Sequence, residues 1–277
     1  MKKIAILLTV YNRKECTLRC LQRLYEQKLP GNITFNVFIT DGGSKDGTVE
    51  SIKKIYPEIN IQVKNGLFWN RGMYCSWEWA AQTGFDFYLW LNDDVYLYDN
   101  CITELLNVSS IYKDRAIIIG PTQSLNHESF SYGGYINKVA VKPNGIPQKI
   151  QKFNGNIVLV PQYVYTVIGN LDYNYIHSHG DFDYGYRAQK AQIEAFQTAM
   201  YLGDCDRHDK LPMWCNPEYP LIKRLKSIRN PTQYDPFEVF YYESKHFGIL
   251  RASFHYITAY LRCIFPRIWI LFGKAKI

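Results

Sequence analysis

The sequence predicts an α/β fold in which a mixed, mainly parallel β-sheet is flanked by helices. Short apolar segments with the composition of buried strands alternate with segments of helical periodicity, and polar residues repeatedly stand where an expected strand ends. This alternation is typical of βαβ units. With 277 residues, 47% of them hydrophobic, the chain is long enough to bury one large core of this kind and a short appendage.

The first expected strand is the apolar segment from Lys3 to Val10, which is followed by the polar tripeptide Tyr11-Asn12-Arg13. A short apolar run bounded by polar residues is the pattern of a buried strand. Asn12 and Glu15 have the spacing of a capping pair, and leucines recur at helical spacing after them. We therefore expect a helix that begins just after Asn12.

A second strand is expected from Phe35 to Thr40, followed by a loop from Asp41 to Thr48 and a helix through Tyr56. In this loop, the tripeptide Asp46-Gly47-Thr48 has the composition of a helix start. Arg71 then opens a third helix, whose apolar residues share one face.

The next apolar segment, Phe87–Leu91, stops abruptly at Asn92-Asp93-Asp94. Two adjacent carboxylates at the end of a buried strand are costly unless a cation neutralises them. In open α/β sheets, ligands also bind at the carboxyl ends of the strands. The motif therefore points to a divalent metal ion held against a phosphorylated substrate. A solvated strand-to-turn junction is the alternative, because Asn and Asp are common in turns.

The excess positive charge of the chain lies in its C-terminal part. From Leu221 to Ile277 there are ten Lys and Arg residues and three acidic ones, a balance of +7, which equals the net charge of the whole chain. We therefore expect a catalytic domain over residues 1–220 and a basic extension over residues 221–277.

Within this extension, apolar residues from Leu250 to Ile264 recur on one helical face and basic residues on another. Such a helix is suited to the surface of an anionic membrane, and no uncharged run approaches the about 20 residues of a spanning helix. The alternative is a helix packed on the body with its basic residues solvated. A nucleic-acid partner is not expected, because the aromatic residues form no evident stacking platform.

The seven cysteines and the N-terminus both favour a cytoplasmic protein. No Cys-x-x-Cys pair occurs, and Cys16 and Cys20 lie one helical turn apart, which suits packing better than a disulfide. The basic start of the chain is followed by an apolar run without a small-residue cleavage site, so we do not expect export.

Taken together, five motifs resemble those of the family 2 glycosyltransferases, which have the GT-A fold. The motifs are Thr9-Val10-Tyr11-Asn12, Asp41 to Thr48, Asn65-Gly66 with Asn70-Arg71-Gly72, Asn92-Asp93-Asp94-Val95, and Gly180 to Ala188. They occur in the order of the family between Lys3 and Asp206. The resemblance is closest to bacterial enzymes that build capsules and O-antigens.

The resemblance implies that Thr9, Tyr11 and Asp41 surround the base of a nucleotide sugar, with Asp41 accepting a hydrogen bond from a uracil-type imide. Many relatives carry a second acidic residue at the position of Gly42, so the identity of the base stays open between UDP- and dTDP-linked donors. For Asp41 the alternative is a loop residue that bonds its own backbone. Arg71 is placed near the nucleotide, where a guanidinium can meet phosphate oxygens; a surface arginine is the alternative.

The resemblance also implies that Asp93 contacts the ribose hydroxyls and that Asp94 ligates Mn²⁺ or Mg²⁺, which bridges the diphosphate. His208 falls where some relatives supply a further metal ligand, and a solvated loop histidine is the alternative. Asp181 is the implied general base that deprotonates the acceptor hydroxyl.

Two neighbours of Asp181 differ in their expected roles. We expect Asp183 to be structural and to pair with Arg187 at i,i+4. Gly180 stands where relatives often carry Glu, which either opens space for the acceptor or indicates a different substrate geometry.

The expected reaction is metal-dependent transfer of a sugar from a nucleotide sugar to an acceptor hydroxyl, with inversion. The expected acceptor is a lipid-linked oligosaccharide in cell-surface polysaccharide synthesis, and the expected location is the cytoplasmic face of the inner membrane, as a peripheral protein. A nucleotidyltransferase is one alternative, although it would carry a Gly-rich, Lys-bearing loop after the first strand. A catalytically inactive carbohydrate-binding relative is the other. Retention of Asp94 and Asp181 argues against it, whereas Gly42 and Gly180 leave it open.

Overall fold

The computed structural model describes residues 1–207 and 211–271. They form two compact units. The first unit comprises residues 1–173 and 181–207, and the second comprises residues 174–180 together with the described residues after 207. Compared with the division expected between residues 220 and 221, the second unit begins earlier and also takes in a short segment from the middle of the chain.

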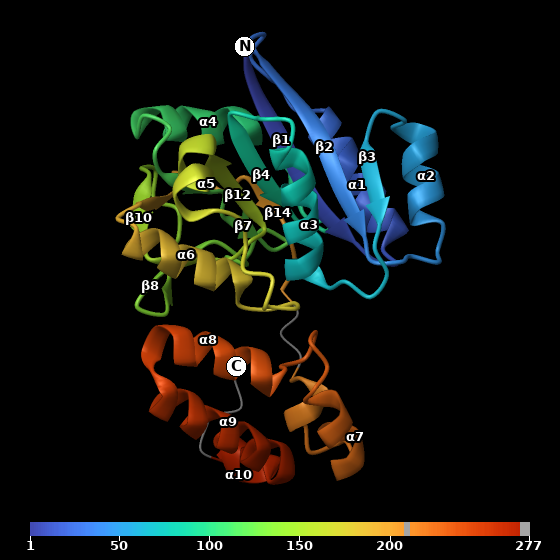
Figure 1. Cartoon of the computed structure of the whole chain (residues 1–277), viewed down its shortest axis with the longest axis vertical. Coiled ribbons are helices and arrows are strands. Elements are labelled where there is room, and N and C mark those ends of the chain that lie inside the picture. Colours follow the sequence, from blue (N-terminus) through green and yellow to red (C-terminus); the bar gives the residue numbers. More distant parts are fainter. Residues whose placement is uncertain (208–210, 272–277) are drawn as a thin grey trace. The chain divides into compact units, whose positions relative to one another are not determined.

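The first unit is built on a large central sheet. Its strands are β1 (Lys2–Val10), β2 (Ile33–Asp41), β3 (Asn60–Val63), β4 (Phe87–Leu91), β6 (Ile117–Ile119), β10 (Gln148–Ile150), β12 (Ile157–Pro161) and β13 (Ala195–Gln197). They lie in the order β10-β13-β6-β12-β4-β1-β2-β3. Figure 1 shows β4, β1, β2 and β3 side by side in this sheet. Pairing is parallel among β1 to β4 and between β6 and β13, and antiparallel around β12 and at β10. The predicted mixed, mainly parallel sheet is confirmed.

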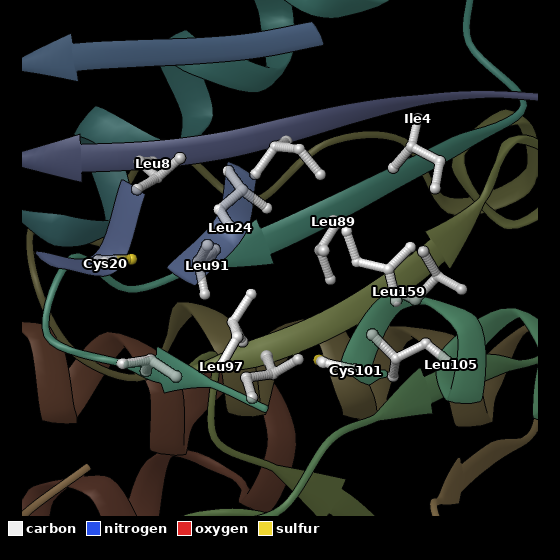
Figure 2. Close-up of a cluster of buried hydrophobic side chains, with 14 of the residues drawn as sticks. Ile4, Leu8, Cys20, Leu24, Leu89, Leu91, Leu97, Cys101, Leu105 and Leu159 are labelled. Atoms are coloured by element: carbon white, nitrogen blue, oxygen red, sulfur yellow. The ribbon is translucent and has the colours of Figure 1, made fainter. Parts of the chain in front are cut away.

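Helices cover both faces of this sheet. One face packs against α1 (Lys14–Tyr25), α2 (Thr48–Ile55) and α4 (Cys101–Ile111). The other face packs against α3 (Trp69–Ala81), α5 (Gln162–Ile168) and α6 (Gly180–Lys190). In β1 the side chains alternate between the two cores, because successive residues of a strand point to opposite faces. Figure 2 shows Leu24 of α1 and Leu105 of α4 within the first core, together with Leu89 and Leu91 of β4.

Two small sheets complete the first unit. One joins β8 (Gly134–Ile136), β9 (Val139–Ala140) and β11 (Lys152–Phe153), and the other joins β5 (Tyr96–Leu97), β7 (Thr122–Gln123) and β14 (Gly203–Asp204). In the second of these sheets, Asp204 is paired with Tyr96. This pairing brings the chain just after β14 beside the loop that follows β4.

The expected capping pair at the start of α1 is wrong. Asn12 has a φ of 49° and accepts a hydrogen bond from the backbone NH of Lys45 (2.7 Å), and α1 has no side-chain cap from its N-cap residue. Its first NH, from Lys14, donates to Asp46 (3.0 Å) instead. The left-handed backbone at Asn12 lets its side chain bond the loop after β2, so a tertiary contact has replaced the local one. Asp46 also accepts the first NH of α2, in agreement with its expected role at a helix start.

The second unit is helical. It contains a 3₁₀ turn, η1 (Met213–Cys215), and the helices α7 (Leu221–Ser227), α8 (Pro236–Phe247), α9 (Ile249–Ile264) and α10 (Pro266–Leu271). Its core is formed around Trp214, with Ile228, Ala259 and Cys263. Among the described residues, no helix has the length and apolarity that are needed to cross a membrane.

Glu238 of α8 fixes the segment 174–180 within the second unit. Its Oε1 accepts hydrogen bonds from the backbone NH groups of Ile176 (2.8 Å) and His177 (3.0 Å). The carboxyl group is buried, and burial raises its pKa to about 7 although these NH groups lower it.

Candidate active site

The topology of the sheet places the candidate site at the carboxyl ends of β1, β2 and β4. From β1 the chain proceeds outward to β2 and β3, and it then returns to β4 on the other side of β1. Ligands bind at such reversals in open α/β sheets. The loops that follow these strands carry the sequence motifs Tyr11-Asn12-Arg13, Asp41 to Thr48, and Asn92-Asp93-Asp94.

The acid pair after β4 points into the protein and is held by α1 and the residue before it. The guanidinium of Arg13 makes two ion pairs, from Nη1 to Oδ1 of Asp93 and from Nη2 to Oδ2 of Asp94, each at 2.9 Å. Oγ1 of Thr17 donates to Oδ2 of Asp93 at 3.1 Å. Asp93 is buried, whereas 23% of the Asp94 side chain is exposed. Both oxygens of Asp93 therefore have partners within the chain.

Burial dominates the electrostatics of this pair. It raises the pKa of Asp93 to about 6, although Arg13 opposes the shift. For Arg13, burial lowers the pKa, but the two carboxylates outweigh it and raise the pKa above its ordinary value. Arg13 is thus a permanent cation between the two acids. The sequence suggested a neutralising cation at this pair, and the guanidinium is the one that the protein itself supplies.

Asp94 is the member of the pair that can accept a metal ion. Within the described part of the chain, its Oδ1 has no charged donor, and it lies 3.7 Å from the thiol sulfur of Cys205. Over residues 1–207 and 211–271, no three His, Cys, Asp or Glu side chains converge on one point. The donor set therefore does not make an all-protein metal site. It fits an ion that takes one carboxylate oxygen from the protein and its remaining ligands from substrate phosphates and water, as Mg²⁺ usually does. The second expected ligand, His208, lies outside the described residues.

Asp181 is the second residue of α6, and its carboxylate is held by two backbone NH groups. Oδ2 accepts from Gly155 (2.9 Å) and Oδ1 accepts from Phe182 (2.8 Å). Burial raises the pKa of Asp181 to about 6, and the two NH groups and the charge of Lys152 act against that rise. A carboxylate of this kind is ionised at neutral pH and is more basic than an ordinary aspartate.

Trp69 links Asp181 to the acid pair. Its indole Nε1 donates to Oδ1 of Asn92 at 2.7 Å, directly before Asp93. Its ring lies against Gly155, where an added Cβ would come within 2.5 Å of Cζ2. The backbone NH of Gly155 in turn holds Asp181. The structure thus connects these two predicted parts of the site through one tryptophan and one glycine.

Asp41 lies at the end of β2 with one bonded and one unpartnered oxygen. Oδ1 accepts from the NH groups of Gly43 and Ser44, each at 2.8 Å, which is the loop-start role considered above. Oδ2 is buried and has no partner. A buried acceptor without a donor is costly, and it offers a place for a ligand NH. At the next residue, a Cβ would lie 2.8 Å from the carbonyl oxygen of Leu67, so the backbone leaves no room for a second acid at Gly42.

Thr9 and Tyr11 come close to the same loop. Thr9 donates to the carbonyl oxygen of Thr40 at 3.2 Å and packs against Gly72 of α3, where an added Cβ would overlap its hydroxyl. The exposed ring of Tyr11 lies next to Gly42. The structure therefore brings Thr9, Tyr11 and Asp41 together around the ends of β1 and β2.

Arg71 is in the first turn of α3 and faces the chain segment before residue 174. Its Nε donates to the carbonyl oxygen of Tyr173 at 3.1 Å, and its guanidinium lies 4.9 Å from the centre of the Tyr173 ring. The expected structural role of Asp183 is confirmed by its ion pair with Arg187 at 2.8 Å.

Sequence reasoning missed four contributors to this site. Arg13, Thr17, Trp69 and Cys205 carry contacts to the acid pair or its neighbours. Arg13 had a usable signal, because it stands three residues after the end of the first strand, at the point where the sheet reverses. The other three gave none, because their partners are distant in the sequence.

The comparison with known families agrees with this geometry. A sequence model described as glycosyl transferase family 2 matches residues 5–170, which is 166 of the 277 residues. The matched part contains Asp41, Asp93 and Asp94 and ends before Asp181. No curated protein matches the chain.

Proposed function

Because this chain belongs to glycosyl transferase family 2, we propose that it moves a sugar from a UDP- or dTDP-linked donor to an acceptor hydroxyl, with inversion at the anomeric carbon. The central sheet with its covering helices is consistent with the GT-A fold. The observation that carries the proposal is the contact chain from Asn92 through Trp69 and Gly155 to Asp181. These contacts link the carboxylate of Asp181, whose pKa is raised, to the pair Asp93 and Asp94, where the strand order of the sheet reverses.

Asp181 has the properties that a base in direct displacement needs. Its pKa of about 6 leaves it ionised at neutral pH and still able to take a proton. The acceptor oxygen gives its proton to Asp181 as it bonds to the anomeric carbon. The bond from that carbon to the diphosphate oxygen breaks, and its electron pair leaves with the nucleoside diphosphate. No covalent enzyme intermediate is needed, and the configuration inverts.

The nucleotide is assigned to the loops after β1 and β2. The unpartnered Oδ2 of Asp41 accepts the imide NH of uracil or thymine, and Tyr11 and Thr9 lie beside it. Asp93 is the ribose contact, and Arg71 is the phosphate contact. For Arg71 this role requires its guanidinium to exchange the carbonyl oxygen of Tyr173 for phosphate.

We assign a Mn²⁺ or Mg²⁺ ion to Asp94, with the donor diphosphate and water as its other ligands. When bound, the ion would supply positive charge that stabilises the departing diphosphate. Asp94 offers Oδ1 for this purpose, while Arg13 holds Oδ2 and keeps the carboxylate oriented.

The acceptor that we propose is a lipid-linked oligosaccharide used in capsule or O-antigen synthesis, at the cytoplasmic face of the inner membrane. The basic C-terminal helices support this choice, because they place cationic and apolar side chains on the surface of the second unit.

The proposal is tested by screening nucleotide sugars with Mn²⁺ for release of nucleoside diphosphate. Asp181→Asn and Asp94→Asn are each expected to lower turnover at least 100-fold. Asp99→Asn is the matched control, because Asp99 forms only exposed ion pairs with Arg23 and Lys28. Release of pyrophosphate would indicate nucleotidyl transfer. Nucleotide binding without any turnover would indicate an inactive carbohydrate-binding protein.

A further inference from the structure

Helix α9 exposes its apolar residues, whereas a surface helix normally buries them. Its apolar stripe is exposed, with fractional exposures of 85% at Leu250, 63% at Phe254 and 59% at Ile257, and it continues through Leu261 and Ile264. Small side chains such as Ala252 and Ala259 are the ones that are buried. A surface helix normally turns its apolar stripe toward the core. We call the residues Leu250, Phe254, Ile257, Leu261 and Ile264 the α9 stripe.

Basic side chains of α9 contact α8 and η1, although the side chain of Arg251 stays 43% exposed and that of His255 38% exposed. Nδ1 of His255 lies 2.6 Å from Oε1 of Glu243, and Nε of Arg251 lies 3.6 Å from the same oxygen. The guanidinium of Arg262 lies 5.2 Å from the centre of the Trp214 ring. Arg251 and His255 therefore both pair with Glu243 and stay partly accessible to solvent.

The charges left on the surface of this region are all positive. Between Leu221 and Leu271, the three acidic residues Asp235, Glu238 and Glu243 are buried. The exposed charged residues are Lys223, Lys226, Arg229, Arg251 and Arg267. Because the acids are buried, no exposed negative charge offsets these five cations between Leu221 and Leu271.

We propose that the α9 stripe docks on an anionic lipid surface, with the exposed basic residues of α7, α9 and α10 contacting the headgroups. An exposed apolar stripe among helices whose exposed charges are all positive has the chemistry of an interfacial helix. A second copy of this face is disfavoured, because an isologous contact would bring like charges together. The proposal deepens the acceptor part of the proposed function and rests on it for the choice of the cytoplasmic leaflet.

The test is co-sedimentation of the full chain with vesicles, without any sugar donor, so that its failure is distinguishable from failure of transfer. Vesicles of phosphatidylcholine with about one-third phosphatidylglycerol are expected to bind the protein at least tenfold more tightly than pure phosphatidylcholine. High salt is expected to weaken this binding.

The variant Phe254→Glu/Ile257→Glu is expected to lower binding of the protein to the anionic vesicles at least tenfold. Both residues are exposed, so the fold should persist. The matched control is Ile111→Glu/Val139→Glu, which alters exposed apolar residues of the first unit and should bind as the unchanged chain does. Equal binding to both vesicle types, or equal loss in both variants, would overturn the proposal. So would a dimer that Ile257→Glu dissociates, because a second copy would then be the occupant.

Discussion

Substitution of Arg13 by Gln tests whether the guanidinium is the built-in counter-ion of the acid pair. It removes the charge that lies 2.9 Å from an oxygen of both Asp93 and Asp94 and leaves a polar side chain in its place. Breaking a fully buried ion pair costs about 3–5 kcal/mol. Here the cost is smaller, because 39% of the Arg13 side chain is exposed and solvent screens it.

Protonation of Asp93 limits the cost further. Its pKa is already about 6 in the intact protein, so neutralising it at pH 7 takes only about 1.4 kcal/mol. We therefore expect Arg13→Gln to lower the free energy of unfolding by about 1–2 kcal/mol at pH 7. At pH 5 Asp93 is already mostly protonated, and the expected loss falls to about 0.5 kcal/mol. The difference between the two proteins should thus widen as the pH rises.

Chemical denaturation at pH 5 and pH 7 measures this effect. Arg23→Gln is the matched control, because Arg23 also pairs with two carboxylates, Glu26 and Asp99, but both are exposed. Its expected loss is below about 1 kcal/mol at either pH. The idea of a built-in counter-ion fails if the two variants lose the same stability at pH 7, or if the loss in Arg13→Gln does not depend on pH.

A second readout of Arg13→Gln is binding of Mn²⁺ alone. Without the guanidinium, Asp94 loses its neighbouring cation and Oδ2 becomes available as well, so free Mn²⁺ should bind up to about tenfold more tightly. Titration of free Mn²⁺ by electron paramagnetic resonance measures this. Unchanged or weaker binding would mean that Arg13 orients the carboxylates and does not compete with the ion.

Three further predictions follow from the same contacts. Gly155→Ala should lower turnover at least tenfold, because its Cβ would displace Trp69 and with it the backbone NH that holds Asp181. In the same assay Gly31→Ala is the control and should leave turnover unchanged, because a Cβ there meets nothing within 4 Å. The pH profile of kcat/KM should fall below about pH 6, because Asp181 must be ionised. If the acid limb persists unchanged in the residual activity of Asp181→Asn, it belongs to another group, such as Asp93. Glu238 has a folded-state pKa of about 7, above its unfolded value of about 4.3, so its contribution to stability is lost as the pH rises between these values. Glu238→Gln should therefore reduce the fall of the unfolding free energy with pH in this range, as measured by chemical denaturation. An unchanged fall with pH would refute the assignment.

Strands of the central sheet were the part of the fold most open to prediction. The expected strand Phe87–Leu91 has the same bounds in the structure, and β1 begins only one residue before its prediction. Both strands are buried on two faces, so their sequence is a continuous apolar run with clear polar ends. Asn12 shows the limit of such local rules. Its spacing from Glu15 predicted a capping pair, but its side chain bonds the loop after β2 instead.

The contacts within the site were less predictable, because they join distant segments. Arg13 reaches Asp93 across 80 positions of the chain, and Asp181 meets Gly155 across 26. Spacing identifies the residue types at each strand end, whereas packing of helices on the sheet decides which of them meet. Helix α9 shows the same limit in another form. Periodicity revealed its two faces, but not the contact of His255 with the buried carboxylate of Glu243 on α8.

Three carboxyl groups of the chain share one property, a pKa that burial raises. Burial raises the pKa of these three groups, those of Asp93, Asp181 and Glu238, to about 6 or 7. Each makes the folded state less stable at neutral pH than an exposed carboxylate would, and such costs tend to be retained where they serve function. Two of the three lie in the candidate site. The third, Glu238, holds the segment 174–180, which continues directly into the first turn of α6 and Asp181. Of the three carboxyl groups, Glu238 is therefore the one that stabilises backbone of the second unit and not the candidate site.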